Sequence, residues 1–229
     1  WIEYPYGTTL HYTLDPTAGL KKFYIKYTDL LGNESGIYED VVSLDKTPPY
    51  NVQSILHTPY WTNTRNIQLT ITAQDDFLGV DKIGLSNGSG FSYFTYAPAA
   101  TLNWQIDPAE GTKNITIVAI DRAGNISNPV TVSCIYDITP PQILTSNIKL
   151  DNNYLPTLRD PVDISITANE ETLISINIRR GSENIFKGVV SNNYGWDGRK
   201  NNGDHVRGGD TFELTYQVID LAGNIGASG

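Results

Sequence analysis

Acidic side chains stand at corresponding positions in separate parts of this 229-residue chain. The pairs Asp75-Asp76 and Glu170-Glu171 each follow a short stretch of alternating apolar residues. If those stretches are strands of two-sheet sandwiches, the loop after each lies at the end where the chain enters the sandwich. Four acids are then expected to converge at each of two entries: Asp45, Asp75, Asp76 and Asp121 at the first, and Asp137, Glu170, Glu171 and Asp220 at the second. Carboxylate oxygens are ligands for Ca²⁺, so we expect either a calcium site or a solvated acidic rim at each entry.

The histidines and the cysteine do not form a pattern that is typical of an enzyme. His11, His57 and His205 are scattered among expected strands and turns, without the paired carboxylate or nucleophile that acid–base catalysis requires. Cys134 lies on an alternating stretch, where a lone thiol is typical of a small core residue. We therefore expect no catalytic residue in this chain and no enzymatic activity.

Two aromatic positions stand in expected loops or strand ends, Tyr60-Trp61 and Trp196. Exposed aromatic rings stack on sugars, and the same residues also pack between neighbouring domains. The sequence leaves both roles open. Trp104 and Tyr12 differ, because they fall on alternating stretches and are expected in a core.

A short sequence motif occurs three times, and it fixes where the acidic and aromatic residues lie in each repeat. Its copies are TDLLGNES from Thr28, IDRAGNIS from Ile120 and IDLAGNIG from Ile219. It predicts a β-hairpin connection, because Asp accepts backbone hydrogen bonds, Gly adopts positive φ without steric cost and Asn tolerates the left-handed region. The first two copies are 92 residues apart (124 − 32 for the glycines), and identical residues recur at that spacing from Leu10 to Pro49, among them Asp15, Asp45 and Thr47. A period of this length is typical of tandem domains rather than of a solenoid.

Paired prolines mark two linkers, 45–49 and 137–141, and hold them extended. They divide the chain into three segments: 1–45, 46–137 and 138–229. The first corresponds to the second half of a repeat, with strands expected at 10–14, 23–27 and 41–44. Its open edge and apolar face would be covered by a neighbour or by strands of another molecule. Only five residues follow Asn224, so we expect no closing strand there and interpret the chain as a fragment of a longer polypeptide.

The composition agrees with an all-β chain. Thr, Ile, Val and Tyr dominate the periodic stretches, and the second segment contains six or seven short alternating runs separated by turn residues. This pattern predicts tandem immunoglobulin-like β-sandwiches in a linear array, the first one incomplete. The net charge of −9 disfavours nucleic acid and anionic membrane surfaces. The sequence shows no signal peptide and no membrane-spanning stretch, so we expect no direct membrane insertion.

Two family resemblances follow from these motifs. The series Gly79-Val80, Asn103-Trp-Gln-Ile106, Asp121-Arg-Ala-Gly-Asn-Ile-Ser and Asp137-Ile-Thr-Pro-Pro resembles bacterial Ig-like repeats of secreted and cell-surface proteins. In the third segment, the run from Gly195 (GWDGRKNNGDHVRGGDTFELTYQVID) resembles the Ig-like domain of flagellar hook-capping proteins, with Phe212 near the family's aromatic position. The first resemblance implies a spacer or adhesive module and not a catalyst. The second implies a module that occurs at the C-terminal ends of many secreted bacterial proteins, and it carries no information about their function.

We therefore predict a non-catalytic stalk or adhesin segment of a larger bacterial protein, located outside the cell or on its surface. Its partners would be neighbouring Ig-like domains of the same or an adjacent chain, and it would have no cofactor unless Ca²⁺ binds at the acidic entries. One alternative is a module that binds glycans or cell-surface proteins. Another is a subunit of an extracellular filament that is completed by strand addition.

Overall fold

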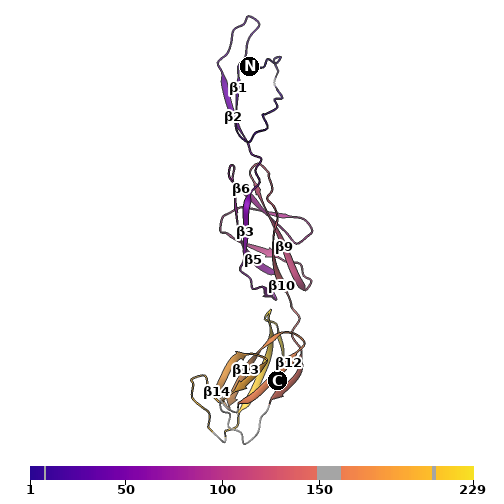
Figure 1. Cartoon of the computed structure of the whole chain (residues 1–229), viewed down its shortest axis with the longest axis vertical. Coiled ribbons are helices and arrows are strands. Elements are labelled where there is room, and N and C mark those ends of the chain that lie inside the picture. Colours follow the sequence, from indigo (N-terminus) through magenta and orange to yellow (C-terminus); the bar gives the residue numbers. More distant parts are fainter. Residues whose placement is uncertain (8, 149–160, 208–209) are drawn as a thin grey trace. The chain divides into compact units, whose positions relative to one another are not determined.

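The computed structural model describes residues 1–7, 9–148, 161–207 and 210–229 (Figure 1). All regular elements among these residues are β-strands, so the all-β prediction is confirmed. The described part of the chain therefore offers no helix with the length and apolarity needed to cross a membrane. Two compact units are present: residues 1–54, 71–100 and 116–131 form one, and residues 55–70, 101–115 and 132–229 form the other. These units divide the second repeat, and the boundaries expected at 45 and 137 stay predictions.

The first segment contains one antiparallel hairpin. β1 (Gly19–Ile25) pairs with β2 (Tyr38–Leu44) from Gly19↔Leu44 to Ile25↔Tyr38. Many large apolar side chains of this segment are exposed, for example Tyr27 and Val41. Tyr12 is 57% exposed, so the expectation that it lies in a core is wrong. The strand expected at 10–14 is not formed. Its counterpart in the second repeat pairs with a strand that precedes it in the repeat, and the described residues of the first segment form no such strand.

Residues 50–136 form the two sheets expected of an Ig-like sandwich. One has the order β3-β5-β8 and the other β4-β10-β9-β6-β7. The strands are β3 (Tyr50–Leu56), β4 (Trp61–Thr62), β5 (Asn66–Gln74), β6 (Val80–Ser86), β7 (Ser92–Thr95), β8 (Thr101–Gln105), β9 (Gly111–Asp121) and β10 (Val130–Tyr136). The alternation read from the sequence matches the burial, because Ile67, Leu69 and Ile71 of β5 are at most 2% exposed while their neighbours face outward.

The described residues between 143 and 228 form a second pair of sheets, β11-β12-β15 and β14-β13-β16-β17. The strands are β11 (Ile143–Ile148), β12 (Val162–Ala168), β13 (Thr172–Arg180), β14 (Glu183–Val190), β15 (Asn193–Trp196), β16 (Glu213–Asp220) and β17 (Ile225–Ser228). Both sheets contribute to one core, with Ile164 and Trp196 from the first and Ile176 and Val218 from the second. The expectation that no strand follows Asn224 is wrong, because β17 pairs with β16.

Gly84 in β6 provides a test of packing in the first unit. A Cβ at this position would lie 2.9 Å from Val118 Cγ2, 3.0 Å from Tyr93 and 3.1 Å from Phe91. We expect Gly84→Ala to lower the free energy of unfolding by about 1–3 kcal/mol, because overpacking forces neighbours away from their preferred positions. Urea denaturation measures the change. Gly36→Ala is the control, since nothing lies within 4 Å of the added Cβ there. Equal stability of the two variants would contradict the prediction.

Candidate metal centres

The repeated Asp-x-x-Gly-Asn phrase forms the same turn in each copy. In the second copy, Asp121 Oδ1 accepts the N–H groups of Ala123 and Asn125, both at 2.8 Å. Gly124 adopts a φ of 93°, which favours glycine. The corresponding glycines Gly32 and Gly223 have φ values of 86° and 90°. The carboxylate therefore holds the turn in shape through backbone contacts, as predicted.

The role of the turn asparagine differs from the prediction. The only described non-glycine residues with positive φ are Asn51 and Ala99, so these asparagines do not use the left-handed region. Their side-chain amides act instead. Asn125 Nδ2 donates to Asp121 Oδ2 at 2.8 Å and to the backbone oxygen of Asp45 at 3.2 Å. The asparagine thus connects the turn to the linker that precedes the sandwich.

The second linker is held in the same way. Asn224 Nδ2 donates to Asp220 Oδ2 at 2.8 Å and to the backbone oxygen of Asp137 at 2.9 Å. The second proline of each linker, Pro49 or Pro141, is buried. These contacts explain why the phrase and the Asp-x-Thr-Pro-Pro linker recur together in the sequence.

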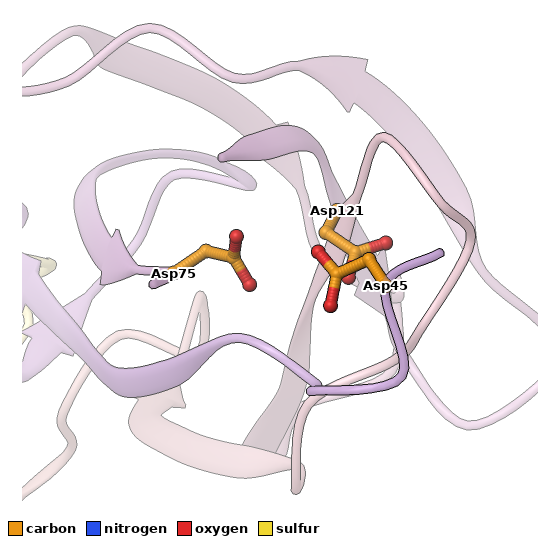
Figure 2. A group of neighbouring side chains, drawn as sticks. All are labelled: Asp45, Asp75 and Asp121. Carbon is orange, nitrogen blue, oxygen red and sulfur yellow. The ribbon is translucent and has the colours of Figure 1, made fainter. Parts of the chain in front are cut away.

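Three carboxylates meet where the first linker reaches the sandwich, and we call Asp45, Asp75 and Asp121 the first acidic group. One oxygen of each lies within 4.8 Å of the others. Figure 2 shows Asp75 extending toward the other two side chains. Asp45 is 7% exposed and Asp121 is 2% exposed, so the negative charges lie largely out of water. Proximity and burial together make this arrangement costly without a cation.

Local hydrogen bonds position the other two carboxylates of the first group. Asp45 Oδ1 accepts the N–H of Thr47 at 3.0 Å and its hydroxyl at 2.7 Å, and the backbone contact is the main reason that the pKa of Asp45 is lowered. Asp75 Oδ2 accepts the N–H of Gly79 at 2.7 Å. Asp75 Oδ1 is buried and has no hydrogen-bond partner among the described residues. A buried carboxylate oxygen without a donor is where a cation would stabilise the structure most.

The second acidic group consists of Asp137, Glu170 and Asp220, again with one oxygen of each within 4.8 Å of the others. Burial raises the pKa of Asp137, and the nearby charges of Asp220 and Glu110 add to the effect. Burial also raises the pKa of Glu170, with contributions from Asp137, Asp220 and Glu110. Within the described residues, none of the ion pairs joining Lys or Arg to a carboxylate includes a member of either group. Both groups therefore carry unbalanced negative charge.

Two of the eight acids proposed from the sequence lie outside these groups. Asp76 Oδ1 accepts the hydroxyl of Tyr50 at 2.6 Å, which raises the pKa of Tyr50. Glu171 is exposed. In each acidic pair only the first residue belongs to the group, because the two side chains of the pair leave the loop in different directions. Glu110 was missed, since a lone acid in a Pro-x-x-Gly turn carries no signal for a site.

The aromatic candidates lie in different surroundings. Trp196 is 3% exposed, its indole N–H donates to the Arg199 oxygen at 2.9 Å, and its ring packs edge-on against Phe212 at 5.6 Å. It is a core residue and has no free face for a ligand. Tyr60 is 54% exposed and packs edge-on against half-buried Trp61 at 6.5 Å. Only this pair is placed at the surface.

The donor set of each acidic group fits a hard cation. Carboxylates supply the side-chain ligands, and Zn²⁺ sites usually include Cys or His. Ca²⁺ takes six to eight oxygens and accepts backbone carbonyls and water beside carboxylates, whereas Mg²⁺ demands a stricter octahedron. The residues present fit Ca²⁺ best on this chemistry.

Comparisons with known proteins give no family assignment. No family model matches the chain, and no curated protein matches it significantly. Among solved structures, fibronectin(III)-like modules of Clostridium thermocellum CbhA are 16% identical and align with a TM-score of 0.47 over 77% of this chain and 90% of theirs. The FN1–FN3 domains of chicken CNTN1 are 10% identical, with a TM-score of 0.46 over 91% of this chain and 75% of theirs. Chitinase ChiA74 from Bacillus thuringiensis is 18% identical, with a TM-score of 0.34 over 82% of this chain and 29% of its own.

These similarities do not extend to function, and the fold assignment follows from the strands of this chain itself. None of the three structures is a flagellar hook-capping protein, so that resemblance stays a prediction. Gly208 and Gly209 of the motif that carries it lie outside the described residues.

Proposed function

We propose that this chain is a non-catalytic structural segment of a larger extracellular bacterial protein and that Ca²⁺ stiffens the entries to its Ig-like sandwiches. One observation carries the proposal: the same group of three carboxylates recurs at corresponding positions of two successive repeats. A solvated acidic rim would not require burial, yet Asp121 and Asp220 are 2% and 4% exposed. Buried acids without cationic partners are retained most readily where they bind a metal.

The position of the linker residue suggests what the cation does. Asp45 and Asp137 each belong both to a Pro-Pro linker and to an acidic group, so a bound cation joins linker, loop and turn at one point. The asparagine contacts already fix the linker carbonyls. A cation adds an ionic bond to the linker side chain and removes the repulsion among the carboxylates. The expected consequence is a narrower range of orientations between successive segments.

Metal binding to the intact chain tests this proposal. Isothermal titration calorimetry is expected to detect two Ca²⁺ ions per chain, with dissociation constants in the range of extracellular modules, roughly 10⁻⁴–10⁻³ M or tighter. Asp75→Asn and Glu170→Gln should each remove one site, because each replaces a charged ligand by a neutral one of equal size. Asp76→Asn and Glu171→Gln are the matched controls and should retain both sites. Absence of binding at millimolar Ca²⁺, or loss of binding in the controls, would overturn the proposal.

A second candidate function rests on exposed Tyr60 and half-buried Trp61. Edge-on packing against Tyr60 fixes the Trp61 ring, and a preordered aromatic surface favours stacking on a sugar. A glycan array read with the intact chain distinguishes this function from a purely mechanical one. Binding that is abolished by Trp61→Ala and retained by Asp75→Asn would support glycan recognition. An array without reproducible signals would contradict glycan recognition, and the mechanical function would be the one that remains.

A further inference from the structure

The side chain of Glu110 contacts the second linker. Glu110 lies in the turn between β8 and β9, and its Oε1 accepts the backbone N–H of Ile138 at 2.6 Å. The Thr139 hydroxyl donates to the same carboxylate, 2.9 Å from each oxygen. One side chain thus holds a backbone donor and a side-chain donor of two consecutive linker residues. Charge-assisted hydrogen bonds of this kind are roughly twice as strong as neutral ones.

We propose that Glu110 fixes the second linker to the β8–β9 turn and makes this junction stiffer than the first one. This inference goes beyond the proposed calcium function and does not depend on a cation, because the contacts are made by the chain alone. Glu110 acts as a positioning residue in this scheme. It sets the orientation of the linker and takes no part in any reaction.

The first repeat supplies an internal comparison. Its corresponding residue is Ala18, in a turn that is otherwise built alike. Lys21 lies 3.5 Å from Asp15 in the first repeat, and Lys113 lies 3.5 Å from Asp107 in the second. An alanine methyl group cannot accept a hydrogen bond, so the first turn cannot hold its linker in this way.

The two linker threonines show the effect of this difference. Thr47 of the first linker donates its hydroxyl to Asp45 Oδ1 at 2.7 Å, within its own linker. Thr139 of the second linker donates its hydroxyl to Glu110. Both threonine N–H groups still bond to the linker aspartate, at 3.0 Å in each case. The second linker therefore keeps the hydrogen bond within its own turn and gains a hydrogen bond to Glu110, which lies outside the linker.

The contact with Glu110 acts on the same peptide group as the contact with Asn224. Asn224 Nδ2 holds the Asp137 carbonyl, and Glu110 holds the next N–H along the chain. The peptide group between Asp137 and Ile138 is bonded through both its oxygen and its nitrogen, to two different turns. Rotation of this peptide would break both contacts. The backbone of the linker is therefore more restricted here than it would be by the paired prolines alone.

Hydrogen exchange of the Ile138 amide tests the inference directly. In the intact chain, with EDTA present, Glu110→Ala should accelerate exchange of this amide by about tenfold or more, because its charged acceptor is lost. The reverse substitution, Ala18→Glu, should slow exchange of the Lys46 amide, which corresponds to Ile138. Glu171→Ala is the control for the loss of one negative charge, because exposed Glu171 forms no hydrogen bond or ion pair with the linker within the described residues. It should leave Ile138 exchange unchanged.

The stiffness of the junction needs its own measurement. Pulsed electron paramagnetic resonance between spin labels at Thr101→Cys and Val189→Cys reports the spread of distances across the second linker, and both sites are exposed. Glu110→Ala should broaden the distance distribution in EDTA, and Glu171→Ala should not. Unchanged Ile138 exchange, or an unchanged distribution in Glu110→Ala, would overturn the inference. Neither result bears on calcium binding, which the titration measures separately.

Discussion

Removing Ca²⁺ from the saturated protein is expected to lower the free energy of unfolding by about 2.7 kcal/mol for each site, at a concentration one hundred times the dissociation constant. For segments of this size the melting temperature should fall by roughly 10–20 °C, since 1 kcal/mol corresponds to about 4–8 °C. The physical reason is that the carboxylates of each acidic group are close together and largely buried, so their charges repel one another without a cation. The first group consists of Asp45, Asp75 and Asp121, and the second acidic group is arranged in the same way. Differential scanning calorimetry in EDTA and in saturating Ca²⁺ measures the difference.

The variant Asp75→Asn separates cation binding from general stabilisation. Asparagine keeps an oxygen that can accept the Gly79 N–H, and it replaces the buried, unpartnered Oδ1 by a neutral amide. In EDTA this variant should therefore be at least as stable as the native chain, because one charge of the group is gone. In Ca²⁺ it should lack the stabilisation at the first site. A variant that is equally destabilised in both conditions would show that Asp75 acts only through its turn.

Much of the fold was predictable because a strand has a simple period. The alternation in β5 and β9 directly indicated which side chains face the core, and burial agrees at Ile67, Leu69, Ile115 and Ile117. The Asp-x-x-Gly-Asn turn was predictable because its residue types have narrow conformational preferences. The strand expected at 10–14 was not, since strand formation depends on a partner as well as on alternation. β17 was missed because a short segment can form a strand by pairing with an existing strand, here β16, even where its own sequence shows little β-propensity.

The acidic groups were partly predictable. Repeat spacing placed Asp45, Asp121 and their counterparts at one end of each sandwich, since their positions follow from the connectivity of the strands. Which member of Asp75-Asp76 belongs to the group depends on side-chain direction in a loop, and composition carries no information about that. The contact of Glu110 with the linker also escaped the sequence, because it joins residues 28 positions apart through a turn without a distinctive motif.

Trp196 was expected in a loop or at a strand end with its ring available to a ligand, and only the exposed ring is wrong. Trp196 ends β15 and pairs with Val162 of β12, yet it is 3% exposed. Its ring fills the core together with Phe212, and its indole N–H is used by the Arg199 oxygen. The Trp196 side chain faces the core because side chains alternate along β15, where Gly195 is exposed and Trp196 is buried.

Trp196→Ala is accordingly expected to lower the free energy of unfolding of the third segment by about 3–5 kcal/mol, as for other buried aromatic truncations. Trp196→Phe keeps most of the ring volume and loses the hydrogen bond to Arg199, so its loss should be about 1–2 kcal/mol. Tyr60→Ala is the control for an exposed ring and should change stability by about 0.5 kcal/mol or less. Urea denaturation followed by fluorescence and circular dichroism measures all three.

The order of these three effects matters more than any single value. If Trp196 is a core residue, the free energy of unfolding falls most in Trp196→Ala, by an intermediate amount in Trp196→Phe and hardly at all in Tyr60→Ala. A surface ring that binds a ligand requires the reverse, with native stability in Trp196→Ala and a loss of binding only. Since the third segment has no disulfide and its core depends on packing between two sheets, removing its largest side chain should affect the whole segment cooperatively.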